Sequence, residues 1–124
     1  MNVVDSSGWL EYFAGTQAAA HFAEAIENTQ KLIVPTLSVL EVFRRILQQK
    51  GEADALQAAA LMQQGQVIDL TLGISLEAAR LGQEQKLPLA DSVILATARH
   101  YKALLWTQDA DFKGMEGVKY FPKH

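Results

Sequence analysis

Short apolar segments alternate with longer helical segments along this chain, and this alternation constrains its fold more than any other feature. Segments rich in β-branched and aromatic residues predict strands at residues 2–5, 31–35, 66–70, 103–107 and 118–121. Apolar residues at helical spacing predict helices at residues 9–13, 17–28, 38–49, 52–64, 75–85 and 89–101. Strands that alternate with helices form parallel sheets covered by helices on both faces. We therefore predict an α/β fold, a three-layer α/β/α sandwich around a twisted, mainly parallel sheet of four to five strands.

The length of 124 residues predicts a single domain over residues 1–124, because two smaller units would each have a marginal core. The chain has no cysteine, which excludes disulfide scaffolds, thiolate zinc sites and cysteine nucleophiles. No apolar run approaches the ~20 residues of a membrane span, so we expect no membrane partner. The first residues lack a basic leader and carry an acid at Asp5, unlike a secretory signal, so we expect a cytoplasmic protein.

The charge balance is slightly acidic. The chain has 14 acidic and 11 basic side chains, for a net charge of -3. Domains that bind nucleic acid through bulk electrostatics are usually basic. The composition therefore argues against tight, nonspecific binding to a polyanion, and the placement of the acids matters more than their surplus.

Acidic residues follow three of the predicted strands. Asp5 closes the first strand, Glu41 lies shortly after the second, and Asp109 follows the fourth. In a parallel sheet these positions share the edge at the carboxyl ends of the strands, where ligands bind. Asp91, in the first turn of the helix at 89–101, joins them only if that helix begins at the same edge.

Structural interpretations compete with a functional one for most of these acids. Asp5 fits a helix N-cap or an Asx turn. Ser38 and Glu41 fit a capping box, and Asp109 with Asp111 fits an ordinary turn. The helix that carries Asp91 is apolar on nearly every side and should be buried. A carboxylate at its start is therefore partly desolvated, which is costly without a compensating partner.

Carboxylates gathered at one edge would repel one another and raise one another's pKa values. A hard divalent cation relieves this repulsion, and oxygen ligands without cysteine or histidine suit Mg²⁺ or Mn²⁺. The chemistry that follows is metal-assisted displacement at phosphorus, in which the metal activates water and orients the phosphate.

Four segments together resemble the PIN domain, and the length and layout look like the VapC-type toxins of bacterial toxin–antitoxin pairs. These segments are Val4-Asp5-Ser6-Ser7-x-Trp9, Ser38-x-x-Glu41, Leu89-Ala90-Asp91-Ser92-x-Ile94-x-Ala96-x-Ala98 and Thr107-x-Asp109-x-Asp111-Phe112. The resemblance covers the whole chain in order, and the segments around Asp91 and Asp109 are the most specific.

The resemblance implies a Mg²⁺- or Mn²⁺-dependent endoribonuclease that cleaves RNA, is silenced by a cognate antitoxin and forms a homodimer. Its implied catalytic residues are Asp5, Glu41, Asp91 and Asp109. Asp5 and Asp91 would be the leading metal ligands, and Asp109 would complete the site or a second metal position. Glu41 would help hold the metal or position the attacking water.

The resemblance also implies supporting residues. Ser6 and Thr107 match positions that support the site by hydrogen bonds, and Asp111 is an alternative to Asp109 as the fourth acid. Arg44 and Arg45, one turn beyond Glu41, are candidates for RNA contacts.

Two other functions remain open at this point. A receiver-like signalling domain also has an acidic Mg²⁺ pocket, but it needs a lysine after a late strand, where the chain offers only Lys123. A catalytically silent PIN-fold interaction domain would keep the fold without the activity. The complete acidic set argues against that alternative.

Overall fold

The sheet at the centre of the molecule has five strands, all parallel, in the order β3-β2-β1-β4-β5. A computed structural model describes residues 1–123 of the chain. The strands are β1 (Asn2–Val4), β2 (Leu32–Pro35), β3 (Gln66–Ile68), β4 (Leu104–Thr107) and β5 (Val118–Tyr120). The predicted strands are all present, and the predicted parallel sheet is confirmed.

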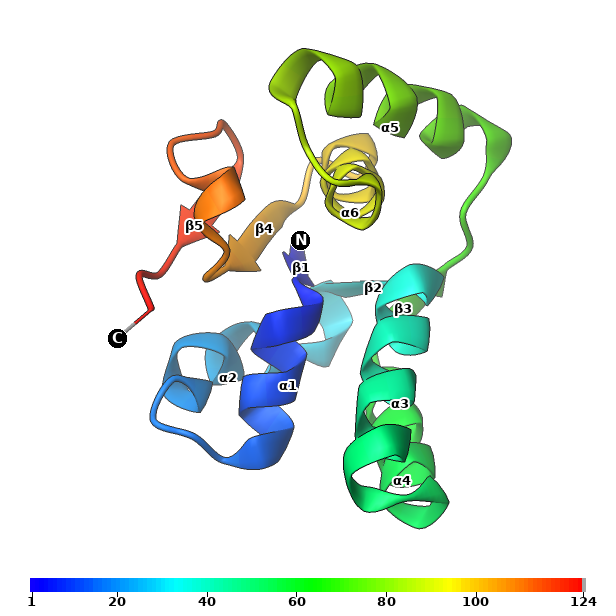
Figure 1. The fold of residues 1–124 in the computed structure, drawn as a ribbon, viewed down its shortest axis with the longest axis vertical. Helices are drawn as coiled ribbons and strands as arrows, with labels where there is room; N and C mark the ends of the chain where they lie inside the picture. The colour runs from blue at the N-terminus through cyan, green and yellow to red at the C-terminus, as the bar shows by residue number, and fades with distance from the viewer. Residues whose placement is uncertain (124) are drawn as a thin grey trace.

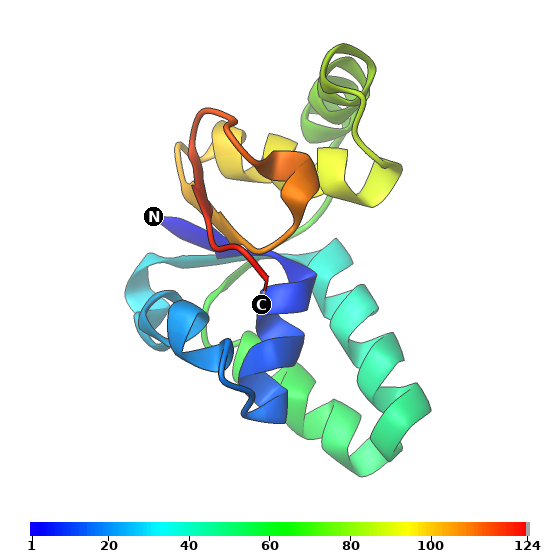
Figure 2. The same ribbon diagram turned by 60° about the vertical axis from the view of Figure 1, so that its left-hand side comes forward.

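Helices cover both faces of this sheet, which confirms the predicted three-layer sandwich (Figure 1). They are α1 (Ser6–Ala14), α2 (Ala19–Glu27), α3 (Thr36–Lys50), α4 (Glu52–Met62), α5 (Leu72–Gln85) and α6 (Leu89–His100), with short 3-10 turns η1 (Thr29–Lys31) and η2 (Ala110–Phe112). The turned view in Figure 2 places α1 to α4 on one side of the sheet and α5 with α6 on the other. Among the described residues, no helix is long and apolar enough to cross a membrane.

The alternation of side chains along each strand divides the core in two. Val3 and Leu105 face the helices α5 and α6, whereas their neighbours Val4 and Trp106 face α1 to α4. Successive side chains of a strand point to opposite faces, so a strand buried on both faces must be apolar at every position. This requirement explains why the inner strands β1, β2 and β4 are largely apolar, whereas the edge strands β3 and β5 are partly exposed and include Gln66 and Lys119.

Helix α6 is the most buried helix of the molecule. Every residue from Ser92 to Ala98 is buried, which confirms the prediction that this helix lies between layers. It packs against the sheet on one side, and α5 covers it on the other (Figure 1). At Gly82 of α5, an added Cβ would lie 3.3 Å from the Cβ of Ser92, so the small residue permits the close approach of the two helices.

The start of α3 differs from the prediction. The helix begins at Thr36, directly after β2, and its cap residue Pro35 provides no side-chain hydrogen bond. Proline has a φ preset near the helical value and no N–H to satisfy, so it allows a helix to begin at once. Ser38 is consequently a buried third residue of the helix, and its hydroxyl has no hydrogen-bond partner within residues 1–123. The capping box predicted for Ser38 and Glu41 is therefore wrong, and Glu41 lies in the second turn.

The buried face of α3 is also narrower than its apolar pattern predicted. Val42 and Ile46 are in the core, but Leu40 is 58% exposed and Leu47 is 43% exposed. Both leucines lie at the edge of the apolar face of α3, where they are not covered by α4 or the sheet.

The strand order creates a topological switch point between β1 and β4. The chain leaves β1 toward β2 and β3 on one side, then crosses back to place β4 on the other side of β1. Loops at the carboxyl ends of β1 and β4 therefore diverge and leave a crevice, which is where open parallel sheets bind ligands.

Candidate functional site

Three carboxylates converge at this switch point. Asp5 follows β1, Asp109 follows β4, and Asp91 is in the first turn of α6. One carboxylate oxygen from each residue lies within 4.8 Å of the others. Helix α6 begins at the carboxyl edge of the sheet, so the condition that the sequence left open for Asp91 is met in the structure.

Asp5 is the most deeply held of the three acids, with a relative exposure of 6%. Its Oδ1 accepts a hydrogen bond from the backbone N–H of Ser6 at 2.8 Å, which makes it the N-cap of α1. Its Oδ2 accepts one from the hydroxyl of Thr107 at 2.9 Å. The capping role expected of Asp5 is thus present together with its place in the acidic cluster. The two bonds prevent the carboxylate from rotating and leave further lone pairs on both oxygens.

Thr107 links this carboxylate to the loop after β4. Its Oγ1 accepts the backbone N–H of Asp109 at 3.0 Å while it donates to Asp5. The Oδ1 of Asp109 in turn accepts the N–H of Asp111 at 2.9 Å, which is the turn geometry that the sequence predicted for this pair. Asp111 is exposed and lies outside the cluster of three carboxylates, whereas Asp109 belongs to it.

Burial and mutual repulsion raise the pKa values of two of these acids. Burial, with smaller contributions from the charges of Asp109 and Glu41, raises the pKa of Asp5 to about 6, although the hydrogen bonds from Thr107 and Ser6 act in the opposite direction. Burial and then the nearby charges of Asp5 and Asp109 raise the pKa of Asp91 to about 7. The cluster therefore holds negative charge that the described residues do not neutralise, and a bound cation would compensate it.

Glu41 lies beside the cluster, held by α1. The hydroxyl of Ser6 donates a hydrogen bond of 2.6 Å to its Oε1, which joins the start of α1 to the second turn of α3. Glu41 is half-buried, so it does not lie on a freely solvated face. The exposed Arg44 and Arg45 line a shallow groove of about 360 Å³ together with Ser6 and Glu41.

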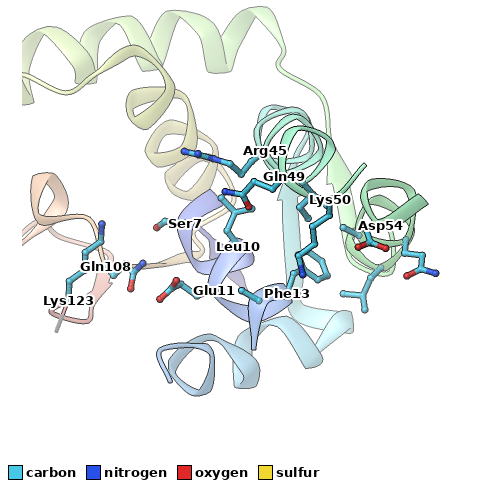
Figure 3. Close-up of a pocket in the computed structure, with 15 residues that line it drawn as sticks. Ser7, Leu10, Glu11, Phe13, Arg45, Gln49, Lys50, Asp54, Gln108 and Lys123 are labelled. Atoms are coloured by element: carbon cyan, nitrogen blue, oxygen red, sulfur yellow. The ribbon is translucent and has the colours of Figure 1, made fainter. Parts of the chain in front are cut away.

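A larger groove of about 610 Å³ runs between α1 and the hairpin of α3 and α4 (Figure 3). Arg45 lines both this groove and the smaller one. The larger groove is also lined by Ser7 and Gln108, which are close in sequence to Asp5 and Asp109. The site assignment from sequence did not include Ser7 or Gln108. Their position next to the acidic motifs was the available signal, but nothing in the local pattern indicates that both side chains enter one groove.

The donor set of the cluster fits a hard divalent cation. It consists only of carboxylate oxygens, and neither cysteine nor histidine contributes a ligand atom. Mg²⁺ and Mn²⁺ prefer such ligands and need only one or two protein carboxylates, with water and phosphate completing the coordination. Asp5, Asp91 and Asp109 are the residues that could hold such an ion.

Comparison with known proteins identifies the family. The family model of the PIN domain matches residues 3–118. No curated protein matches the chain at a significant level of sequence similarity.

Solved structures share the fold. A toxin–antitoxin complex from Klebsiella pneumoniae matches with a TM-score of 0.83 and 24% identity, over 99% of this chain and 100% of that chain. The toxin VapC20 of Mycobacterium tuberculosis, which cleaves the sarcin–ricin loop, matches with a TM-score of 0.76 and 17% identity, over 94% and 95% of the two chains. A DNA-bound VapBC complex from Salmonella typhimurium matches with a TM-score of 0.78 and 12% identity, over 98% and 96%.

Proposed function

This chain belongs to the PIN domain family, and on that premise we propose that it is a Mg²⁺- or Mn²⁺-dependent endoribonuclease, the toxin of a toxin–antitoxin pair. The observation that carries the proposal is the convergence of Asp5, Asp91 and Asp109, whose ligand oxygens lie within 4.8 Å of one another. Two of these acids have raised pKa values, so the protein holds repelling carboxylates at the switch point of its sheet. Sites that bear such a cost are characteristic of catalysis.

In this proposal Asp5, Asp91 and Asp109 hold the metal. When bound, the ion supplies positive charge to the scissile phosphate and favours ionisation of the attacking water. Thr107 and the N–H of Ser6 fix both oxygens of Asp5. The Oδ1 of Asp109 accepts the N–H of Asp111, which fixes the orientation of this carboxylate.

Glu41 has a different place in the proposed reaction. It lies outside the group of three ligand atoms, and Ser6 holds its Oε1. We assign Glu41 to positioning the attacking water, for which its free oxygen serves as the acceptor. Arg44 and Arg45 follow it along α3 into solvent, where they contact RNA phosphates. The chain as a whole has a negative net charge, so in this proposal the positive charge that binds RNA comes from the metal and from these two arginines.

The remaining parts of the proposal concern partners and location. Structures similar to this chain include toxin–antitoxin complexes, which supports a cognate antitoxin as a partner. We also propose a homodimer, because large apolar side chains such as Leu72, 76% exposed, and Leu89, 83% exposed, lie on the surface of the single chain. A toxin that acts on cellular RNA would work in the cytoplasm.

Cleavage of RNA tests the proposed function directly. We expect the wild-type protein to cleave RNA in the presence of Mg²⁺ or Mn²⁺, and we expect cleavage to stop when EDTA removes the metal. Asp5→Asn and Asp91→Asn should each lower the cleavage rate by more than ~100-fold. Loss of a residue that only hydrogen-bonds to a metal ligand already costs up to about that much, and these two residues are the proposed ligands themselves. Glu84→Gln, an exposed acid on α5, is the matched control and should cleave like the wild type. If both aspartate variants cleave as fast as the wild type, the site assignment is wrong.

The same proteins separate the enzyme from the two alternatives. A silent interaction domain would not cleave RNA, and a broken metal site would show no rise of Tm on titration with Mn²⁺. The match to the PIN family model argues against the receiver-like alternative. Intact mass after incubation with a small phosphodonor tests that alternative, and a phosphorylated protein would support it.

A further inference from the structure

The polar end of the larger groove lies next to the acidic site. We call this end the flanking pocket, and its residues are Ser7, Glu11, Arg45, Gln108 and Lys123. Ser7 comes two residues after Asp5, and Gln108 stands between Thr107 and Asp109. The elements that position the acids therefore also position the pocket. Figure 3 shows Arg45 extending from α3 toward the side of the groove where Ser7 and Gln108 lie.

Two polar side chains of this pocket, Ser7 and Gln108, can bond to a ligand in the groove. The hydroxyl oxygen of Ser7 is buried and has no hydrogen-bond partner within residues 1–123. Gln108 is only 7% exposed and lines the same groove, and its carboxamide is not among the fully buried groups without a partner, so it is available to a molecule in the groove. A buried hydroxyl without a partner, such as that of Ser7, is uncommon in a folded protein, because it has lost its hydrogen bonds to water. A ligand in the groove would supply the missing partner.

The chemistry of the pocket fits a nucleotide. A carboxamide presents a donor and an acceptor side by side, which is the pattern that recognises the edge of a nucleobase. Arg45 and Lys123 provide cations for the adjoining phosphates, and the Glu11 carboxylate can accept a hydrogen bond from a base amino group. The groove volume of about 610 Å³ lies within the range of small-molecule sites.

We propose that the flanking pocket binds the nucleotide next to the cleaved bond and that Gln108 determines which base is accepted there, with Ser7 as a second hydrogen-bonding group. The inference rests on the proposed ribonuclease function and adds a specificity-determining residue to it. Gln108 acts on the choice of substrate and is not part of the metal site.

Cleavage of a random-sequence RNA library, with the cut sites read by sequencing, tests the proposal. The wild-type protein should prefer one base at a position beside the cut, and Gln108→Leu should lose that preference. On the preferred sequence the kcat/KM of this variant should fall by roughly 10- to 100-fold, the range that one bidentate base contact provides. Its Tm should stay unchanged, since leucine fills similar space and no hydrogen bond of the Gln108 side chain to the rest of residues 1–123 is lost. Gln83→Leu, exposed on α5, is the matched control and should keep the wild-type pattern.

Two results of the cleavage assay would overturn the proposal. The first is a Gln108→Leu variant with the wild-type cleavage pattern and kcat/KM, which would leave the groove to a protein ligand. The second is a fall in Tm with an equal loss of rate on every sequence, which would make Gln108 structural. If the wild-type protein cleaves no RNA, the proposed function itself fails, and RNA binding tests the pocket separately. In that case fluorescent RNA tetranucleotides are titrated onto the wild type and Gln108→Leu with Mg²⁺: a base preference that the variant loses supports the pocket, and equal affinities overturn it.

Discussion

Thr107 shows how one side chain can organise several acids. Its hydroxyl donates to Asp5 and accepts the N–H of Asp109, so a single buried oxygen sets the relative position of two proposed metal ligands. The hydrogen bond also lowers the pKa of Asp5, against the larger effect of burial. Thr107 itself is fully buried at the end of β4 and cannot move away from the site.

Replacement of Thr107 by valine should therefore impair activity more than stability. Thr107→Val keeps the shape of the side chain but removes both hydrogen bonds, and we expect metal affinity or RNA cleavage to fall by roughly 10- to 100-fold. Thr71→Val is the matched control, because the Thr71 hydroxyl caps α5 through the N–H of Ile74, far from the acids in the fold. It should cost about 1 kcal/mol of stability and leave cleavage unchanged. Equal cleavage by Thr107→Val and the wild type would contradict the proposed support of Asp5.

The raised pKa values of Asp5 and Asp91 predict how stability depends on pH. Both carboxyl groups have an ordinary pKa of 3.8, and the folded protein raises these values to about 6 and about 7. Between these limits the folded state binds more protons than the unfolded state, so the free energy of unfolding falls as pH rises. The contribution is fully present below about pH 4 and is lost above about pH 7.

Thermal unfolding in EDTA at several pH values checks this dependence. The metal-free wild type should lose Tm between pH 5 and pH 8, and Asp91→Asn should lose less because one titrating group is gone. At pH 8, adding Mn²⁺ should raise the Tm of the wild-type protein more than the Tm of Asp91→Asn. A wild-type Tm that rises from pH 5 to pH 8 without metal would contradict the raised pKa values.

At the scale of elements, the position of the site depends on how closely helices approach the sheet. Helix α1 begins at Asp5 and packs on β1 and α2 through Gly8 and Trp9, both buried. A Cβ added at Gly8 would lie 2.7 Å from Phe22 Cδ1 and 2.8 Å from Val4 Cγ1. Such distances are shorter than real Cβ contacts, so only glycine allows α1 to lie where Ser6 reaches Glu41.

Alanine at Gly8 should consequently destabilise the fold. We expect Gly8→Ala to lower the free energy of unfolding by about 1–3 kcal/mol, the usual cost of overpacking a core. Gly73→Ala is the control in α5, where the nearest atom to an added Cβ is 4.0 Å away. It should gain about 0.5 kcal/mol, because alanine is a better helix former than glycine. Urea unfolding of both variants checks the pair, and equal midpoints would contradict the packing argument.

At the scale of the whole molecule, the strand order decides where function can lie. Strands β1 and β4 are neighbours in the sheet but lie a hundred residues apart in the chain, and their carboxyl ends carry Asp5 and Asp109. The return of the chain through α5 and α6 adds Asp91 from a helix that runs back along the sheet. Three segments thus meet at one point only in the complete fold, which is why the cluster requires an intact domain.

The exposed leucines predict the behaviour of the molecule in solution. Leu72 and Leu89 are largely exposed, and covering them in an interface would be favourable because apolar contact with water costs free energy. We expect light scattering to give a mass twice that of the chain at micromolar concentration. A monomer mass across the concentration range would contradict the proposed homodimer.

Local patterns in the sequence predicted the elements well. The inner strands β1, β2 and β4 are largely apolar because both of their faces are buried, and the apolar circumference of residues 92–98 predicts a helix between layers. The capping pattern at Ser38 predicts a start of α3 two residues later than the observed start at Thr36, which directly follows Pro35. The exposure of Leu40 and Leu47 could not be predicted, since it depends on where the neighbouring helices end.

The sequence by itself determined that this protein is a parallel α/β domain and that Asp5, Glu41 and Asp109 follow strands toward one edge of its sheet. These features follow from residue periodicity, which can be read from short segments, and from the common direction of parallel strands, which follows from the fold class. Only the tertiary structure decided that Asp91 reaches that edge, that Asp109 rather than Asp111 lies among the three carboxylates, and that Gln108 enters a groove. The physical reason is that side-chain convergence depends on how helices cross back over the sheet. No short stretch of sequence contains that information.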